Sequence, residues 1–317
     1  MILADIGCNA EHGQSQKGYI VSQAQDNLLV IGARSLIGRR MAEALSEAGW
    51  PQDRVAFTSR RPLSGRQGLL LDTAEPFAFM PGKSFAQVVI CVPIWLISDV
   101  LMARLQVLGM TRMVVFSSTS RLTKAESDES AEREVVAKLA EGERGVSAFC
   151  DAHGIAWTIL RPTLIYDEGR DENITRIAET IQKLGFFPVC GKASGLRQPV
   201  HARDLADAAL QALTAKAAHN KSYNVSGGED LTYRLMVERI FTAIGRKPVI
   251  ISLPEWLWRV IFALLNTMSA KHALKRNVQM VLRMNKDLWF AHASATRDFG
   301  YDPQAFRPDF INSKPTS

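Results

Sequence analysis

The chain has 317 residues, of which 47% are hydrophobic and 22% are charged. This balance is typical of a globular protein that buries a large core, and it excludes a disordered or fibrous chain. The net charge is +6, and the basic residues are spread along the sequence without a long run. We therefore expect a small anionic ligand as the partner rather than nucleic acid.

The four cysteines occur without a CxxC motif and without the spacing of zinc ligands; they are Cys8, Cys91, Cys150 and Cys190. This usage predicts free thiols, a reducing compartment such as the cytoplasm, and no structural metal. Residues 1–27 have no basic start followed by an apolar stretch, so we interpret them as an N-terminal extension and not as a secretory signal.

Residues 253–268 form an apolar segment that contains Glu255 and Arg259 and is too short to span a bilayer. We favour an amphipathic helix that packs on the protein. The alternative is contact with a membrane interface through Trp256 and Trp258. The basic residues that follow these tryptophans are Lys271, Lys275 and Arg276, together with His272.

From Asn27 onward, short apolar runs alternate with longer segments of helical periodicity. The expected strands are residues 28–31, 55–58, 68–71, 86–92, 112–117 and 156–161. The expected helices between them are residues 38–48, 95–109 and 131–153. This alternation predicts an α/β fold, a doubly wound Rossmann-type parallel sheet with right-handed crossovers.

After Pro162 the alternation breaks, and we expect helices at residues 174–184 and 204–213 in a smaller C-terminal lobe. The predicted organisation has three parts. Residues 1–27 are the extension and residues 28–162 are the Rossmann core. Residues 163–317 hold the segments of the lobe and the C-terminal helices, interleaved with the core.

The segment GARSLIG at residues 32–38 follows the first expected strand and opens the first helix. Such a turn presents unpaired backbone N–H groups and the positive end of a helix dipole, which together suit a diphosphate. Gly32 permits the tight turn and Gly38 lets the helix lie close to the strand. Ser35 replaces the middle glycine of the dinucleotide fingerprint and can cap the helix or donate to the ligand. The pattern favours dinucleotide binding over a simple turn.

The second expected strand is followed by Arg60 and Arg61, where an NAD site usually has an acid for the ribose hydroxyls. Two cations suit a 2′-phosphate, so we favour NADP over NAD as the cofactor; the alternative is that both arginines only solvate a loop. We expect Asp72 either to meet the adenine edge of the cofactor or to belong to an ordinary turn. The expected cofactor contacts are Gly32, Arg34, Ser35, Leu36, Ile37, Gly38, Arg60, Arg61, Asp72, Val92, Pro93 and Pro162.

Several further segments carry a family resemblance. They are VVFSST at residues 114–119, WTILRPTLIY at 157–166, RQPVHARDLA at 197–206, YNVSGG at 223–228 and ATRDFGY at 295–301. In this order and spacing they resemble the short-chain dehydrogenase/reductase superfamily, most of all its extended and atypical members, the nucleotide-sugar epimerases, dehydratases and reductases. The resemblance covers residues 28–306. It implies an NAD(P) cofactor, a nucleotide-sugar-like substrate and often a dimer.

Members of this superfamily usually combine a Ser or Thr with a Tyr-x-x-x-Lys pair, whose phenol exchanges a proton with the substrate. Thr119 matches the Ser/Thr position, but none of the five tyrosines lies in the helix expected after it. Glu134 and Lys138 have the spacing of the pair and form either an exposed ion pair, which is simpler, or a catalytic pair. Tyr166 either supplies the phenol from another direction or packs in the core.

The resemblance implies Thr163, Asn173 and Arg197 as substrate contacts, and the fork of Arg197 suits phosphate. His201 in the same segment is more simply a structural histidine. Two functions follow. The first is an NADP-binding oxidoreductase or epimerase in which Thr119 polarises a carbonyl and Tyr166 or Lys138 supplies the proton. The second is a non-catalytic dinucleotide-binding sensor, scaffold or assembly protein.

Overall fold

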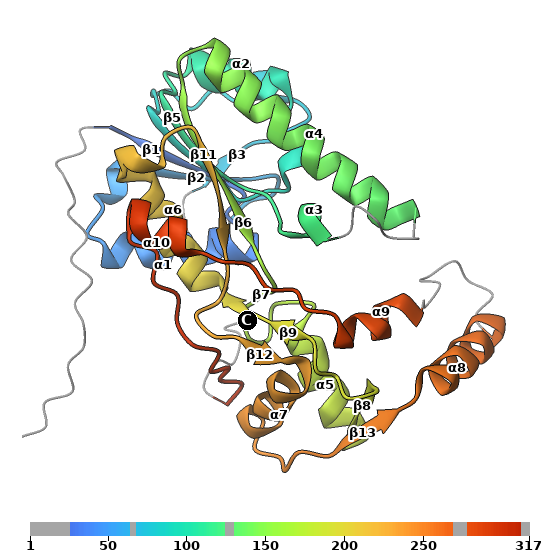
Figure 1. Cartoon of the computed structure of the whole chain (residues 1–317). Coiled ribbons are helices and arrows are strands. Elements are labelled where there is room, and N and C mark those ends of the chain that lie inside the picture. Colours follow the sequence, from blue (N-terminus) through green and yellow to red (C-terminus); the bar gives the residue numbers. More distant parts are fainter. Residues whose placement is uncertain (1–25, 64–67, 124–129, 269–277, 312–317) are drawn as a thin grey trace, which may run out of the picture.

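This computed structural model describes residues 26–63, 68–123, 130–268 and 278–311. Its centre is a seven-stranded parallel sheet with the strand order β11-β6-β5-β4-β1-β2-β3 (Figure 1). The strands are β1 (Leu28–Ile31), β2 (Val55–Ser59), β3 (Leu69–Leu70), β4 (Gln87–Ile90), β5 (Arg112–Phe116), β6 (Ala156–Pro162) and β11 (Lys221–Val225). The predicted parallel sheet is confirmed.

Helices cover both faces of this sheet (Figure 1). On one face lie α1 (Leu36–Glu47), α6 (Ala202–Thr214) and α10 (Ala293–Phe299), and on the other lie α2 (Asp99–Val107) and α4 (Ser130–Ala152). Side chains alternate along a strand, so Leu28 and Val30 of β1 enter one hydrophobic cluster while Leu29 and Ile31 enter the other. Burial on both faces explains why these strands are continuous apolar runs. The doubly wound α/β class follows from this arrangement.

The strand order reverses at β1, which pairs with β2 on one side and with β4 on the other. In open α/β sheets, ligands bind outside the carboxyl ends of the strands at such a reversal. The chain between β1 and α1 therefore lies at the favoured place for a ligand.

Two expectations about the core need correction. The helix expected at residues 95–109 is interrupted. A short 3-10 helix, Ile94–Leu96, comes first, and α2 begins anew because the Ser98 side chain caps it by accepting from the N–H of Leu101 at 3.2 Å. The seventh strand, β11, was not expected from the sequence. It pairs in parallel with β6 and extends the sheet beyond the six predicted strands.

A second lobe lies below the carboxyl edge of the sheet in Figure 1. Its elements are β7 (Ile165–Tyr166), α5 (Ile174–Leu184), β8 (Phe187–Cys190), β9 (Leu196–Arg197), β10 (Val200–His201), β12 (Leu231–Thr232), α7 (Tyr233–Ala243), β13 (Ile250–Leu253), α8 (Glu255–Met268) and α9 (Val278–Leu282). They enclose a third hydrophobic cluster. The chain enters the lobe after β6, returns to the sheet for α6 and β11, and returns again for α10.

No helix in the described ranges is both long and apolar enough to cross a bilayer. Residues 1–25 of the predicted extension lie outside the described residues, as do Cys8, Lys271, His272, Lys275 and Arg276. Three cysteines belong to the described residues. Cys91, Cys150 and Cys190 are buried free thiols.

Candidate functional site

The turn between β1 and α1 depends on two glycines. Gly32 has a φ of +93°, and a Cβ at this position would lie 2.8 Å from Cγ1 of Val92. A Cβ at Gly38 would lie 2.2 Å from the carbonyl oxygen of Gly32. The turn therefore needs a left-handed backbone at its start and a close approach of α1 at its end, and only glycine satisfies both.

The first turn of α1 leaves backbone donors available. The hydroxyl of Ser35 accepts from the N–H of Gly38 at 3.0 Å and so caps the helix. Within the described chain, the N–H groups of Leu36 and Ile37 have no acceptor. These two donors and the positive end of the helix dipole form an anion site, although Ser35 occupies the position of the middle glycine.

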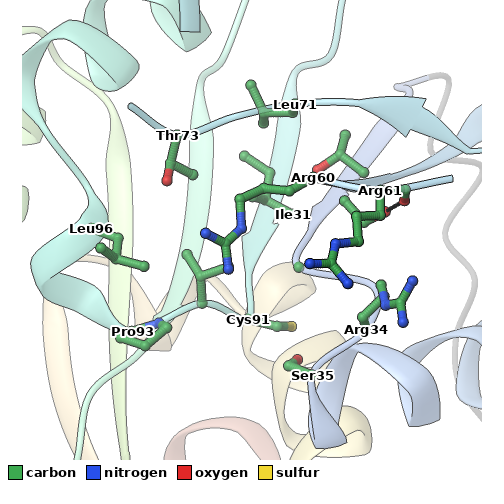
Figure 2. A pocket seen from close by; sticks show the side chains of 14 residues that line it. Ile31, Arg34, Ser35, Arg60, Arg61, Leu71, Thr73, Cys91, Pro93 and Leu96 are labelled. Atoms are coloured by element: carbon green, nitrogen blue, oxygen red, sulfur yellow. Dashed lines mark hydrogen bonds between the residues drawn. The ribbon is translucent and has the colours of Figure 1, made fainter. Parts of the chain in front are cut away.

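A first cavity of about 720 Å³ opens beside this turn, at the ends of β1, β2 and β4. In Figure 2 the side chains of Arg60 and Arg61 extend from the end of β2 into this space, and Arg34 reaches it from the turn. None of these three guanidinium groups has a hydrogen-bond or ion-pair partner among the described residues. The lining comprises Ile31, Gly32, Arg34, Ser35, Thr58, Ser59, Arg60, Arg61, Leu71, Thr73, Cys91, Val92, Pro93 and Leu96.

Two further features of the first cavity matter for a ligand. Oγ1 of Thr58 is fully buried near the end of β2 and has no hydrogen-bond partner among the described residues. A buried hydroxyl without a partner costs free energy unless a bound molecule supplies one. The thiol of Cys91 forms part of the wall, and burial raises its pKa to about 12, so it stays neutral. An unpaired buried hydroxyl, free helix amides and three unpaired cations fit a phosphorylated dinucleotide.

Some of the expected cofactor residues do not line the first cavity. Leu36 lines a second cavity, and Pro162 ends β6 with a carbonyl that accepts from Thr119. Ile37 is buried in the core. Asp72 is exposed and is not part of the cavity wall, since its carboxylate accepts from the N–H of Ala74 at 3.0 Å. The ordinary turn interpretation accounts for Asp72.

The second cavity, of about 1070 Å³, lies between the turn, the loop after β5 and the second lobe. It shares Arg34 and Ser35 with the first cavity, so the two spaces meet at the start of α1. Its lining comprises Arg34, Ser35, Leu36, Arg39, Ser118, Thr119, Ser120, Thr123, Thr163, Leu164, Ile165, Arg170, Asp171, Glu172, Asn173, Arg197, Gln198, Arg283, Leu288 and Phe290. The structure thus brings Thr119, Thr163, Asn173 and Arg197 to the wall of one cavity.

Two neighbouring hydroxyls in this cavity use their protons differently. Thr119 donates to the carbonyl of Pro162 at 3.0 Å, so only its lone pairs are left for a ligand. Ser118 accepts from the N–H of Ser120 at 3.1 Å, and no described residue accepts the proton of its hydroxyl. Sequence reasoning selected Thr119 and overlooked Ser118, because the choice between them depends on hydrogen bonds to the backbone.

Tyr166 does not reach the second cavity. Its ring is buried and packs edge-on against the rings of His201 and Phe306. Burial and then the charges of Glu168 and Asp204 raise the pKa of its phenol far above the ordinary value of 10. The expectation that Tyr166 supplies a proton is therefore wrong for this geometry, because the side chain turns into the core of the second lobe.

Lys138 also lies away from both cavities. It forms an ion pair with Glu134 at 2.6 Å one turn earlier on α4, and both side chains are half exposed or more. The catalytic interpretation of Lys138 is wrong in this geometry, and the ion-pair alternative is confirmed.

Arg197 reaches the wall of the second cavity, but backbone carbonyls engage its guanidinium. It donates to Lys286 at 2.8 Å, to Arg283 at 2.6 Å and to Leu196 at 2.6 Å. Burial lowers its pKa from the ordinary value, although the nearby Tyr233 and Asp287 favour the charged form. Its main visible role is to hold the chain at residues 283–286 against β9. Thr163 likewise donates to the carbonyl of Gln198, while the exposed Asn173 makes a weak bond to the carbonyl of Ile165 at 3.4 Å.

A buried carboxylate beneath the loop after β5 was not identified from the sequence. Glu143 of α4 accepts from the hydroxyl of Ser117 at 2.6 Å and from Arg161 at 2.9 and 2.6 Å, and it also pairs with Arg121. Burial alone would raise the pKa of Glu143, but hydrogen bonds from Arg161 and Ser117 and the charges of Arg161 and Arg121 outweigh it, so the pKa is lowered. This cluster fixes the start of the segment that carries Ser118 and Thr119.

Asp167, Glu168 and His201 also converge, with their ligand atoms within 4.8 Å of one another. Nδ1 of His201 accepts from the N–H of Arg203, so Nε2 carries the proton and donates to Glu168 at 3.2 Å. Arg40 and Arg170 pair with Asp167. Two guanidinium groups balance the two carboxylates, so the charges explain this cluster as an ion-pair network that joins α1 to the second lobe.

Comparison with known proteins places these features in a family. UDP-glucose 4-epimerase of Vibrio cholerae is 21% identical over 185 residues, which is 58% of this chain and 56% of that protein. 2-alkyl-3-oxoalkanoate reductase of Stenotrophomonas maltophilia is 29% identical over 176 residues, 53% of each chain. This chain therefore spans about half the length of these curated relatives.

A solved structure shows the same fold over more of the chain. RMD from Pseudomonas aeruginosa, complexed with NADPH, has a TM-score of 0.61 at 14% identity, covering 89% of this chain and 94% of that one. Residues 28–226, more than half of the present chain, match the NAD dependent epimerase/dehydratase family. The resemblance drawn from the sequence is thereby confirmed: this protein belongs to the NAD-dependent epimerase/dehydratase family of extended short-chain dehydrogenases/reductases.

Proposed function

We propose that this protein binds NADP(H) in the first cavity and acts as an oxidoreductase or epimerase on an anionic, nucleotide-sugar-like substrate in the second. The observation that carries the proposal is that the two cavities meet at Arg34 and Ser35, beside the free amides of Leu36 and Ile37. A dinucleotide held by its diphosphate at this junction would have one end in each space.

The choice of NADP over NAD rests on charge. Arg34, Arg60 and Arg61 line the first cavity without a partner among the described residues, and the described wall contains no carboxylate. A 2′-phosphate would pair with these cations, whereas the ribose hydroxyls of NAD would lack their usual acidic acceptor. The complex of RMD with NADPH is a precedent within this fold, although the family is described as NAD dependent.

The substrate class also follows from charge. Arg39, Arg170 and Arg283 line the second cavity in addition to Arg34. Of the two acids in the wall, Asp171 is already occupied, because it accepts from the N–H groups of Asn173 and Ile174 at the start of α5. Arg170 and Arg283 are already paired with Asp167 and Glu132. Arg34 and Arg39 form no ion pair among the described residues, and these two guanidinium groups favour a phosphorylated substrate over a neutral one.

Bound NADP(H) would supply or accept a hydride. The chain's own contribution at the reacting carbon is the hydroxyl pair after β5. Ser118 has a proton to donate to a carbonyl oxygen, and Thr119 has lone pairs that accept from an alcohol. The buried bonds of Glu143 to Ser117 and Arg161 hold this segment in place.

A second candidate is a non-catalytic sensor or scaffold that binds the dinucleotide. It is favoured by one observation: within the described part of the chain, no tyrosine, lysine or histidine lines the second cavity. Loss of a general acid typically lowers a rate by about 10²- to 10⁴-fold. In either case the free buried cysteines suit a reducing compartment, and we propose the cytoplasm.

Two measurements test these proposals. Fluorescence titration with NADPH and NADH should show an affinity for NADPH that is about tenfold or more above the affinity for NADH. One charge-assisted hydrogen bond contributes a factor of this size. Equal or absent binding would refute the cofactor assignment. Turnover assays with UDP-sugars and 4-keto sugars should then show cofactor-dependent conversion, and bound NADPH without any conversion would select the sensor.

A further inference from the structure

The helix α8 is apolar on two opposite faces. Trp258 and Phe262 are only 8% and 7% exposed and enter the hydrophobic cluster of the second lobe. Trp258 also donates from its indole to the carbonyl of Val189 at 3.4 Å. Trp256 precedes Trp258 by two residues, and Val260 precedes Phe262 by two. Trp256 and Val260 are 65% and 47% exposed. Two residues correspond to about 200° around a helix, so the exposed pair lies opposite the packed pair.

The segment that precedes α8 also exposes apolar side chains. Val249 and Ile251 are 48% and 41% exposed, and β13, which contains Ile251, pairs on one side with β8. Figure 1 shows α8 and β13 at the outer edge of the second lobe, remote from the parallel sheet. We call Val249, Ile251, Trp256 and Val260 the α8 face. Exposed apolar side chains on neighbouring elements, with a tryptophan among them, are typical of a contact surface.

Charge identifies what this face would contact. Residues 246–264 contain three cations, Arg246, Lys247 and Arg259, which are all exposed, and one acid, Glu255. The acid is already paired with Arg259 at 2.5 Å. The net charge of residues 246–264 is therefore positive, which complements an anionic surface.

We propose that the α8 face docks on the surface of a bilayer that contains anionic lipid. Tryptophan favours the level of the lipid headgroups because its indole has an apolar body and one N–H donor. Trp256 and Val260 would enter the boundary between headgroups and acyl chains, and the exposed cations would contact anionic headgroups. A second copy of the chain fits less well, since a twofold contact through this face would place like charges of both copies on one rim.

Vesicle sedimentation with the full-length protein tests this proposal without any assumption about cofactor or substrate. The wild type should sediment with vesicles of phosphatidylcholine and phosphatidylglycerol. Binding should fall with phosphatidylcholine alone and at high salt. The variants Trp256→Ala and Val260→Asp should each lower the partition coefficient by about tenfold, because each removes apolar contact with the lipid.

A matched control is Val107→Asp, since Val107 is an exposed apolar residue at the end of α2, outside the α8 face. It should bind vesicles like the wild type. Lys247→Glu should weaken binding only when anionic lipid is present. Circular dichroism melting of each variant checks that the fold is retained.

Three outcomes would overturn the proposal. The wild type does not sediment with the anionic vesicles, Trp256→Ala binds as well as the wild type, or Val107→Asp loses as much binding as the α8 variants. Light scattering that shows a dimer abolished by Trp256→Ala would instead assign the face to a second copy.

Discussion

The hydroxyl of Ser35 accepts a hydrogen bond from the backbone N–H of Gly38 at 3.0 Å. The residue that replaces the middle glycine of the nucleotide fingerprint therefore turns toward the helix and stabilises its first turn. The N–H groups of Leu36 and Ile37 stay available at the entrance of the first cavity. The substitution changes how the turn is stabilised and keeps its free donors.

Replacement of this cap should reduce stability in a graded way. Ser35→Ala should lower the free energy of unfolding by about 1 kcal/mol, whereas Ser35→Gly should cost only a few tenths, the usual difference for an N-cap. Urea unfolding measures both values. Ser35→Gly should also retain NADPH affinity. The control is Ser46→Ala on the exposed side of the same helix, which should change stability by less than about 0.5 kcal/mol.

The arginines after β2 should determine cofactor preference. Arg60→Ala and Arg61→Ala should each weaken NADPH binding by about 10- to 100-fold, because each removes a charge-assisted bond to the 2′-phosphate, and NADH binding should stay unchanged. Fluorescence titration gives both constants. Arg176→Ala, on α5 and outside both cavity walls, removes the same charge as a control. An equal loss for both cofactors would mean that these arginines do not distinguish them.

Arg197 should behave as a structural residue. Arg197→Lys removes the fork that binds the carbonyls of Lys286 and Arg283, so we expect a loss of about 2 kcal/mol in unfolding free energy, as for hydrogen bonds to a charged group. NADPH affinity should remain unchanged. Unfolding and cofactor titration on the same preparation separate the two effects. A variant of unchanged stability with a raised KM for a nucleotide sugar would return Arg197 to the role of substrate ligand.

The buried Glu143 cluster predicts a pH dependence of stability. Glu143→Gln should destabilise the protein by about 3 kcal/mol at neutral pH, because Arg161 and Arg121 lose their buried partner. The pKa of Glu143 is lowered in the folded state, so its contribution is present above the ordinary value of 4.5 and is lost as pH falls through the lower folded value.

The difference in stability between wild type and Glu143→Gln should therefore be full at neutral pH and should shrink below about 4.5. Urea unfolding across this range measures it. A difference that stays constant into acid would show that Glu143 is not held in its charged form.

The sequence by itself determined the core of the fold. The continuous apolar runs and helical segments predicted the parallel sheet, and the expected strand at 28–31 and helix at 174–184 coincide with β1 and α5. Both signals are local: residues buried on two faces of a sheet must all be apolar, and a helix buried on one face repeats its apolar residues every three or four positions. The nucleotide turn was predictable for the same reason, since Gly32 and Gly38 satisfy local steric demands.

Tertiary structure alone decided which side chains face the cavities. Tyr166 lies in β7 and Arg197 in β9 of the second lobe. The ring of Tyr166 packs against His201, and the guanidinium of Arg197 binds the carbonyls of residues 283 and 286. Those partners lie 35 or more residues away in the sequence. The buried bonds of Glu143 likewise depend on the packing of α4 against the loop after β5. A side chain's role depends on which atoms compete for its hydrogen bonds, and only the folded chain brings those atoms together.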